Sequence, residues 1–146
     1  MNTRVNINET EPQAFKAMYA LENYLASTQL SKNQKELIKI RASQINGCAF
    51  CIDMHTKDAL KYGETTQRIF LLNAWHETQL FTEEEKVILA ITEEITLITN
   101  KGLSDVTYAK AEQFFNRNQI AQIIMAVVTI NAWNRIAVST QLEPAQ

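Results

Sequence analysis

The sequence predicts an all-α fold, a bundle of about six to seven helices in a single domain spanning residues 1–146. Glycine and proline make up only 3 + 2 = 5 of the 146 residues, which disfavours turn-rich sandwiches and barrels. Apolar residues recur at helical spacing, and no run alternates long enough to indicate a strand. The formal charge of −2 provides no electropositive field for nucleic acid or an anionic membrane.

Local signals place the first three helices. Pro12 suits the first turn of a helix with apolar residues at helical spacing. Ser31 and Gln34 form a capping box that opens a second helix, and Gly47 offers its end. A third helix is expected over residues 48–62, a central helix with CxxC at its N-terminus.

The middle of the chain predicts two further helices. Thr66 is expected to cap a short helix that ends near Trp75. Thr82 and Glu85 form a second capping box, which opens a helix reaching Thr99. Acidic residues in the first turn of that helix complement the positive end of its dipole.

The last third of the chain predicts two helices, the second apolar on nearly every side. Ser104 begins the first, and Asn118 is expected to cap the other, which extends toward Gln141. Such a helix is central or covered by another subunit, so we expect a homo-oligomer. The longest apolar stretch, residues 123–132, is too short for a membrane span, and the polar residues 1–12 do not resemble a secretory signal. We therefore expect a cytoplasmic protein.

Two cysteines and a histidine carry the chemistry. At about 100° per residue, Cys48 and His55 lie within about 60° of Cys51, so the three side chains share one stripe if the helix begins by Cys48. A flexible first turn after Gly47 permits the local adjustment that a disulfide bond requires. The helix N-terminus stabilises a thiolate, and His55 can accept the proton of Cys51. A thiolate beside a second thiol is typical of a reversible redox pair.

Other interpretations of these residues stay open. A zinc site needs four ligands, or three with a water, and His76 lies 21 residues beyond His55. Two inert core cysteines with a surface histidine also fit the pattern. Ile52 excludes the c-type haem motif, and the lack of predicted strands disfavours a thioredoxin fold.

Two carboxylates are candidates for orienting His55. Asp58 lies three residues on in the same stripe and is favoured by helical arithmetic. Glu36 lies at a suitable height if the two helices are antiparallel, but the apolar periodicity favours a solvated glutamate there. Arg41 falls in the apolar arc of its helix, where a buried or inter-subunit salt bridge with a glutamate of the helix opened by Thr82 is expected.

One spaced pattern runs through the middle of the chain. It consists of Glu36-Leu37-Ile38, Arg41, Asn46-Gly47-Cys48, Cys51 and His55, with Glu36 twelve positions before Cys48. This pattern resembles the AhpD-like alkylhydroperoxidase family of the carboxymuconolactone decarboxylase superfamily. Similar segments at 73–75, 81–86 and 131–135 extend the likeness over most of the chain.

The resemblance implies an all-helical AhpD-like fold, homo-oligomers such as trimers or hexamers, and thiol peroxidase activity that needs no metal or bound cofactor. By position, Cys51 resembles the peroxidatic thiol that attacks a small hydroperoxide, and Cys48 the resolving thiol. His55 and Glu36 resemble the proton relay, which replaces the preference for Asp58. A dihydrolipoyl or thioredoxin-like protein is the expected dithiol reductant.

Phe50 departs from the family pattern, because the archetypal member has a second histidine between its cysteines. This departure weakens the expectation of efficient peroxide turnover. Decarboxylase relatives generally lack the cysteine pair, so its presence favours redox chemistry. A redox-sensing or structural oligomer, and a decarboxylase acting on a small lactone, are the alternative functions.

Overall fold

Helices account for the regular structure of the described chain, which confirms the all-α expectation. The computed structural model describes residues 4–146, and no strand occurs in that range. In chain order the elements are α1 (Ile7–Thr10), α2 (Pro12–Ala26), α3 (Lys32–Asn46), α4 (Ala49–Lys61), α5 (Thr66–Phe70), the 3-10 helix η1 (Leu72–Glu77), α6 (Glu83–Thr96), α7 (Asp105–Glu112) and α8 (Arg117–Thr140).

Side-chain caps fix the starts of the helices that matter most for the site. The capping boxes predicted at Ser31 and Thr82 are both formed, with Gln34 and Glu85 bonding back to the backbone N–H of the cap. Gly47 ends α3 at φ 66°, a left-handed conformation that glycine adopts without strain. Only two residues therefore separate α3 from α4.

Two predicted boundaries in the middle of the chain are wrong. Thr65, not Thr66, caps α5, because its hydroxyl accepts the backbone N–H of Arg68. The helical region then breaks and continues as η1. Helix α6 ends at Thr96 instead of Thr99, since the backbone leaves the helical conformation at the next residue.

The start of the last helix is also two residues earlier than expected. Asn116, not Asn118, caps α8, because it forms a capping box with Gln119 that the position at Asn118 does not offer. The short helix α1 was not predicted either, and the Asn6 side chain caps it.

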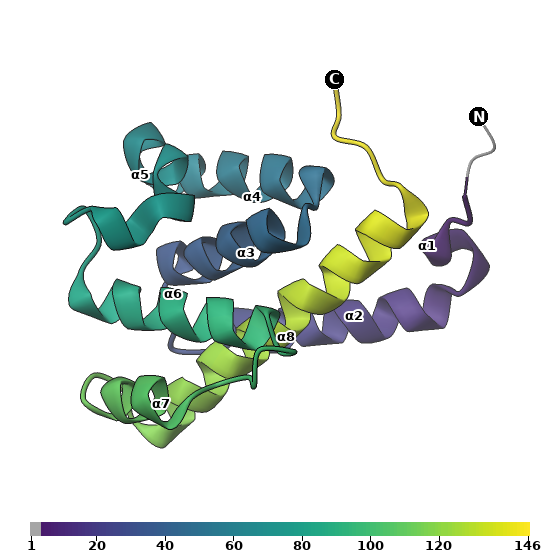
Figure 1. Ribbon diagram of the computed structural model, residues 1–146. Helices are drawn as coiled ribbons and strands as arrows, with labels where there is room; N and C mark the ends of the chain where they lie inside the picture. The colour runs from purple at the N-terminus through teal and green to yellow at the C-terminus, as the bar shows by residue number, and fades with distance from the viewer. Residues whose placement is uncertain (1–3) are drawn as a thin grey trace.

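Helices α3 and α8 form the centre of the bundle (Figure 1). Helix α3 packs against α4, α6 and α8, while α8 also contacts α2, α4, α6 and α7. The main core lies between these helices and excludes water almost completely. Its most deeply buried large side chains are Leu25, Ile38, Val87, Ile88, Ile91, Ile120, Ile123, Val127 and Ile130.

Helix α8 is longer and more apolar than a surface helix. With 24 residues it has the length and composition to cross a membrane, so the expectation that this region is too short for a span is wrong. The extension comes from helical residues on both sides of the 123–132 stretch. A core helix of a bundle meets the same criteria, and five other helices contact α8.

A half-buried ion pair joins α3 to α6, as expected for Arg41. Arg41 Nε donates to Glu93 Oε1 at 2.8 Å, and Trp75 Nε1 donates to the same oxygen at 2.7 Å. Burial acts to raise the pKa of Glu93, but the hydrogen bonds from Arg41 and Trp75 outweigh it and hold that pKa below its ordinary value. The ionised carboxylate therefore stabilises the fold above its ordinary pKa, and this stabilisation is lost as the pH falls through the lowered value.

Replacing Glu93 by glutamine is expected to lower the free energy of unfolding by about 2–4 kcal/mol at neutral pH, because the Arg41 charge is left without its partner. Urea denaturation of both proteins at neutral and at strongly acidic pH measures the difference. The difference in the free energy of unfolding between the two proteins should become smaller in acid, where the wild-type carboxylate is protonated. A difference that stays constant with pH would show that the shape of the side chain, not its charge, accounts for the loss of stability.

Candidate active site

The turn between α3 and α4 holds the two cysteines. After Gly47, Cys48 takes an extended conformation (φ −88°, ψ 92°) as the N-cap of α4. Its backbone N–H donates to the carbonyl of Ser43 at 3.0 Å, which ties the cap to the last turn of α3. Cys51, in the first turn of α4, forms a disulfide bond with Cys48, with the Cα atoms 5.3 Å apart. The non-helical backbone of Cys48 thus supplies the local flexibility that a disulfide bond within one turn requires.

Both sulfurs are enclosed by protein. Cys48 is 1% exposed and Cys51 is 2% exposed. The pair packs against Ala137 near the end of α8, with Phe50 alongside. Helix α8 therefore covers the disulfide bond, a contact that the CxxC motif by itself does not predict.

His55 and Glu36 form a buried pair one turn further along α4. His55 Nδ1 lies 2.9 Å from Glu36 Oε2, and Glu36 is only 6% exposed. The short turn folds α4 back along α3 and so brings the two side chains together. The interpretation of Glu36 as a solvated glutamate is therefore wrong. Asp58 does not bond to His55 and pairs instead with Lys61 at 3.3 Å.

A second ion pair, absent from the sequence analysis, lies beside this buried pair. Lys39 Nζ is 3.3 Å from Glu22 Oε2 and 4.0 Å from Glu36 Oε1. Trp133 Nε1 donates to the other oxygen of Glu22 at 3.0 Å. These contacts join α2, α3 and α8 around Glu36.

The neighbouring Lys35 is affected by the same surroundings. Burial lowers the pKa of Lys35, and the ammonium of Lys39 lowers it further.

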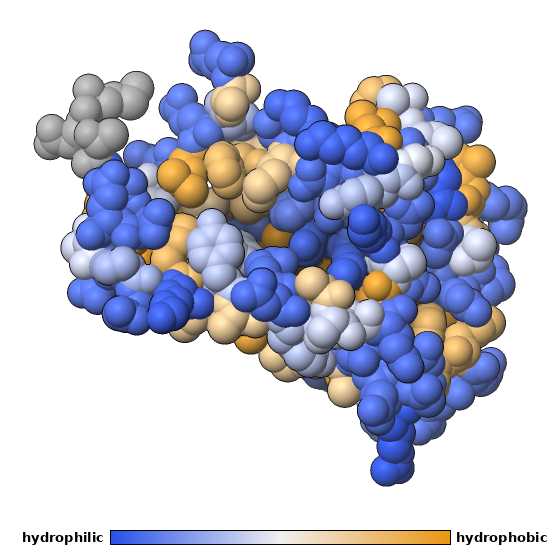
Figure 2. Space-filling view, turned by 180° about the vertical axis from the view of Figure 1, so that it is seen from behind, coloured by the Kyte–Doolittle hydropathy of each residue, from blue (hydrophilic) through white to orange (hydrophobic). Residues whose placement is uncertain are grey.

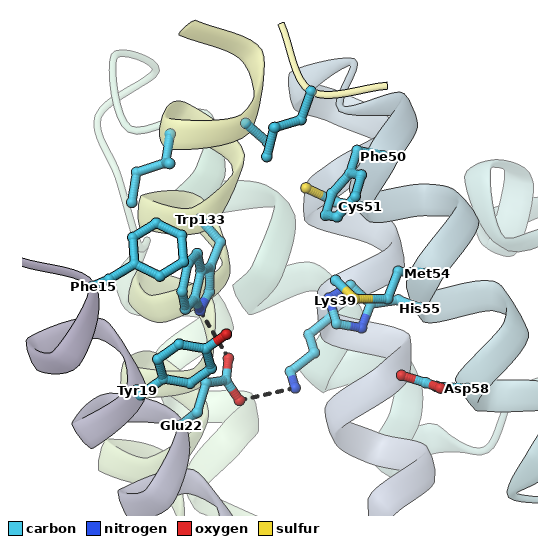
Figure 3. Close-up of a pocket in the computed structure, with 13 residues that line it drawn as sticks. Phe15, Tyr19, Glu22, Lys39, Phe50, Cys51, Met54, His55, Asp58 and Trp133 are labelled. Carbon is cyan, nitrogen blue, oxygen red and sulfur yellow. Dashed lines mark hydrogen bonds and ion pairs between the residues drawn. The ribbon is translucent and has the colours of Figure 1, made fainter. Parts of the chain in front are cut away.

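A cavity of about 360 Å³ opens between α2 and α8 on one side and α3 and α4 on the other (Figure 3). Figure 2 views the molecule from behind, where apolar surface borders a hollow near the centre of that face. We call this cavity the thiol pocket, since Cys51 and His55 both line it. The rest of its wall is mostly apolar and includes three charged side chains, Glu22, Lys39 and Asp58. The other lining residues are Phe15, Tyr19, Phe50, Met54, Trp133, Ile136, Ala137 and Leu142.

One group of side chains in the described range has the donor atoms of a metal site. The ligand atoms of Glu36, His55 and Asp58 lie within 4.8 Å of one another. Glu36 already uses one oxygen toward His55 and the other toward Lys39, whose positive charge opposes a cation there. Neither cysteine belongs to this group, so the zinc ligand set considered from the sequence is not assembled.

A comparison with family models identifies the chain. The model of the carboxymuconolactone decarboxylase family matches residues 12–94, more than half of the 146 residues. The chain belongs to this family. The protein YdfG of Bacillus subtilis strain 168, described as uncharacterized, is 43% identical over 139 residues, which are 95% of each chain.

Solved structures of AhpD-like proteins share the fold of this family member. A protein of unknown function from Agrobacterium tumefaciens, assigned to AhpD antioxidant defence, is 40% identical with a TM-score of 0.95 over 99% of both chains. The AhpD core of a peroxidase-related protein from Ralstonia eutropha JMP134 has a TM-score of 0.83 at 16% identity, over 95% of this chain and 74% of the other. The debrominase Bmp8 has the same TM-score at 14% identity, over 94% and 74%. The predicted family is therefore confirmed, and this family includes enzymes.

Proposed function

We propose that this family member is a CxxC-dependent thiol peroxidase that reduces small hydroperoxides. One observation carries the proposal: Cys51 and His55 line the same cavity, with Glu36 bonded to His55 and Cys48 bonded to Cys51. A nucleophile, a base and a group that orients the base are the parts that nucleophilic catalysis requires. The disulfide bond supports reversible redox chemistry over an inert role for the cysteines.

The oxidative half of the reaction begins with the reduced pair. Glu36 orients His55, which accepts the proton of Cys51. The thiolate attacks the terminal peroxide oxygen, so that an S–O bond forms, the O–O bond breaks, and the leaving alkoxide takes the proton from His55 as an alcohol. Cys48 then attacks the sulfenic acid sulfur of Cys51, which forms the disulfide bond and releases water.

The burial of the disulfide bond favours one kind of reductant. A globular thioredoxin-like protein must place its own cysteine against an exposed sulfur, whereas neither cysteine here is more than 2% exposed. A dihydrolipoyl group carries its two thiols at the end of a long aliphatic arm. Such an arm matches a largely apolar pocket of about 360 Å³. We therefore favour a dihydrolipoyl protein over a thioredoxin-like one as the dithiol donor.

The proposal includes assembly into a homo-oligomer, a trimer or a hexamer. Exposed apolar side chains support this assembly, because an interface with another copy of the chain would cover them. Val128 and Val138 on α8 are both more than 40% exposed, and Phe70 is 76% exposed. We place the oligomer in the cytoplasm, whose reducing thiol pool would keep a redox pair cycling.

Reduced protein mixed with one equivalent of cumene hydroperoxide is expected to lose both free thiols and to form the Cys48–Cys51 disulfide bond. Mass spectrometry follows the bond, and a dithiol with excess peroxide tests turnover. Unchanged thiols after peroxide treatment would support the structural or sensing alternative. Conversion of a carboxylactone without any thiol would support the decarboxylase alternative. Either result would overturn the proposal.

A further inference from the structure

The two sulfurs of the disulfide bond lie in different surroundings. Cys51 lines the thiol pocket, and Figure 3 shows its sulfur at one end of the cavity, on the same side as His55. Cys48 does not line the pocket, is only 1% exposed and packs against Ala137 of α8. A molecule that enters the pocket therefore meets the sulfur of Cys51 and not that of Cys48.

Cys48 also has a hydrogen-bond donor that Cys51 lacks. As the N-cap of α4, its Sγ accepts the backbone N–H of Cys51 at 3.3 Å. Helix α4 has 13 residues, and its unpaired N-terminal N–H groups favour negative charge at this place. A thiolate on Cys48 is thus stabilised where it forms, in the manner of a charged cap.

We propose that the reducing dithiol enters the thiol pocket and attacks Sγ of Cys51, and that Cys48 is the leaving thiolate. The inference rests on the proposed redox cycle and names the sulfur through which that cycle closes. Thiol–disulfide exchange runs faster when the leaving thiolate is the more stable one and when the attacked sulfur is accessible. Both conditions single out Cys51 as the attacked sulfur.

The exchange proceeds in two balanced steps. The first thiol of the donor gives its proton to His55, and its sulfur bonds to Cys51 Sγ while the Cys48–Cys51 bond breaks and leaves the electron pair on Cys48. The second thiol of the donor loses its proton to the Cys48 thiolate and attacks the donor's first sulfur. The donor leaves as a cyclic disulfide, and Cys51 departs as a thiolate that takes back the proton held on His55.

Cys51 therefore acts in both halves of the cycle. It is the nucleophile toward peroxide and the electrophile toward the dithiol. Cys48 never meets either small molecule, because it is buried and does not line the pocket. One pocket thus serves two reactants in turn, and each excludes the other while bound.

The first test maps the site of attack on the oxidised wild-type protein. The protein is mixed with β-mercaptoethanol, a small neutral monothiol, quenched in acid at successive times, and blocked with N-ethylmaleimide. Fragment mass spectrometry of the peptide that holds both cysteines locates each label. We expect mercaptoethanol on Cys51 and maleimide on Cys48. The same experiment in urea is the control, since unfolding exposes both sulfurs and should spread the label over both.

A second measurement covers the case in which the mixed disulfide is too short-lived to trap. The Cys48→Ser and Cys51→Ser variants are each loaded with mercaptoethanol on the remaining cysteine in urea and refolded. Dithiothreitol should release the label from Cys51 at least about tenfold faster than from Cys48. Equal rates, or a wild-type label on Cys48, would overturn the inference. A label on Cys51 in a protein that does not consume peroxide would instead leave the inference intact and overturn the proposed function.

Discussion

Serine in place of Cys51 is expected to lower the rate of peroxide consumption by about 10³-fold or more, the largest effect of any single change in the chain. A hydroxyl is not ionised near neutral pH and does not form a stable oxidised intermediate with peroxide. Cys51 is also the only cysteine that lines the thiol pocket, so Cys48 cannot take its place. Peroxide loss measured with an excess of dithiol gives the rate.

The matched control is Cys48→Ser, which removes the other sulfur of the same bond. This variant should reduce one equivalent of peroxide and then stall as a sulfenic acid on Cys51, which a dimedone probe detects. A serine can still cap α4, so the helix start is retained. If Cys51→Ser kept its turnover while Cys48→Ser lost the first equivalent, the two roles would be reversed.

Local sequence determines the parts of the fold that were predicted correctly. The two capping boxes, Ser31 with Gln34 and Thr82 with Glu85, form hydrogen bonds to unpaired backbone N–H groups within one helical turn. A segment of four residues is therefore enough to predict them. The start of α8 was placed at Asn118 although Asn116 also caps well. The capping box of Asn116 with Gln119, which Asn118 cannot form, selects between the two positions.

The burial of Glu36 shows what periodicity cannot reveal. The periodicity of α3 predicts a solvated Glu36, yet this residue is buried, and so are the polar Lys39 and Ser43 of the same helix. They are covered because α4 folds back along α3 and α8 crosses it, and because Glu22 of α2 reaches Lys39. The family pattern pairs Glu36 with His55 by position, and the physical reason for their contact appears only with the tertiary structure.

Local sequence patterns do not predict the wall of the thiol pocket either, because this wall also depends on tertiary contacts. Phe15 and Trp133 lie on α2 and α8, far apart in the sequence, and their ring centroids are 5.3 Å apart in the structure. Each looks like an ordinary core residue of an amphipathic helix. The two cysteines are recognisable from their spacing within one turn, while the cavity that Cys51 lines depends on how four helices meet.

Replacing His55 by glutamine is expected to lower the rate of peroxide reduction at neutral pH by about 10²-fold or more, because Cys51 loses the base that accepts its proton. Glu36→Gln should produce a smaller loss in the same direction, since the carboxylate orients His55 from 2.9 Å and does not touch the thiol. The alkylation rate of Cys51 in the reduced protein, followed against pH, separates this role from a structural one. The deficit should shrink as the pH approaches the ordinary thiol pKa of about 8.5, where the thiolate forms without help.

Asp53→Asn is the matched control for these two variants, because it removes a carboxylate from the same helix α4. The Asp53 side chain bonds only to Lys57, at 2.8 Å on the exposed side, and does not line the thiol pocket. Its pH profile should therefore coincide with that of the wild type. A deficit in His55→Gln that is equally large at every pH would instead mean that the imidazole only supports the packing around Cys51. In that case the proton of the thiol would have to leave by another route, and the Glu36–His55 pair would have no part in the chemistry.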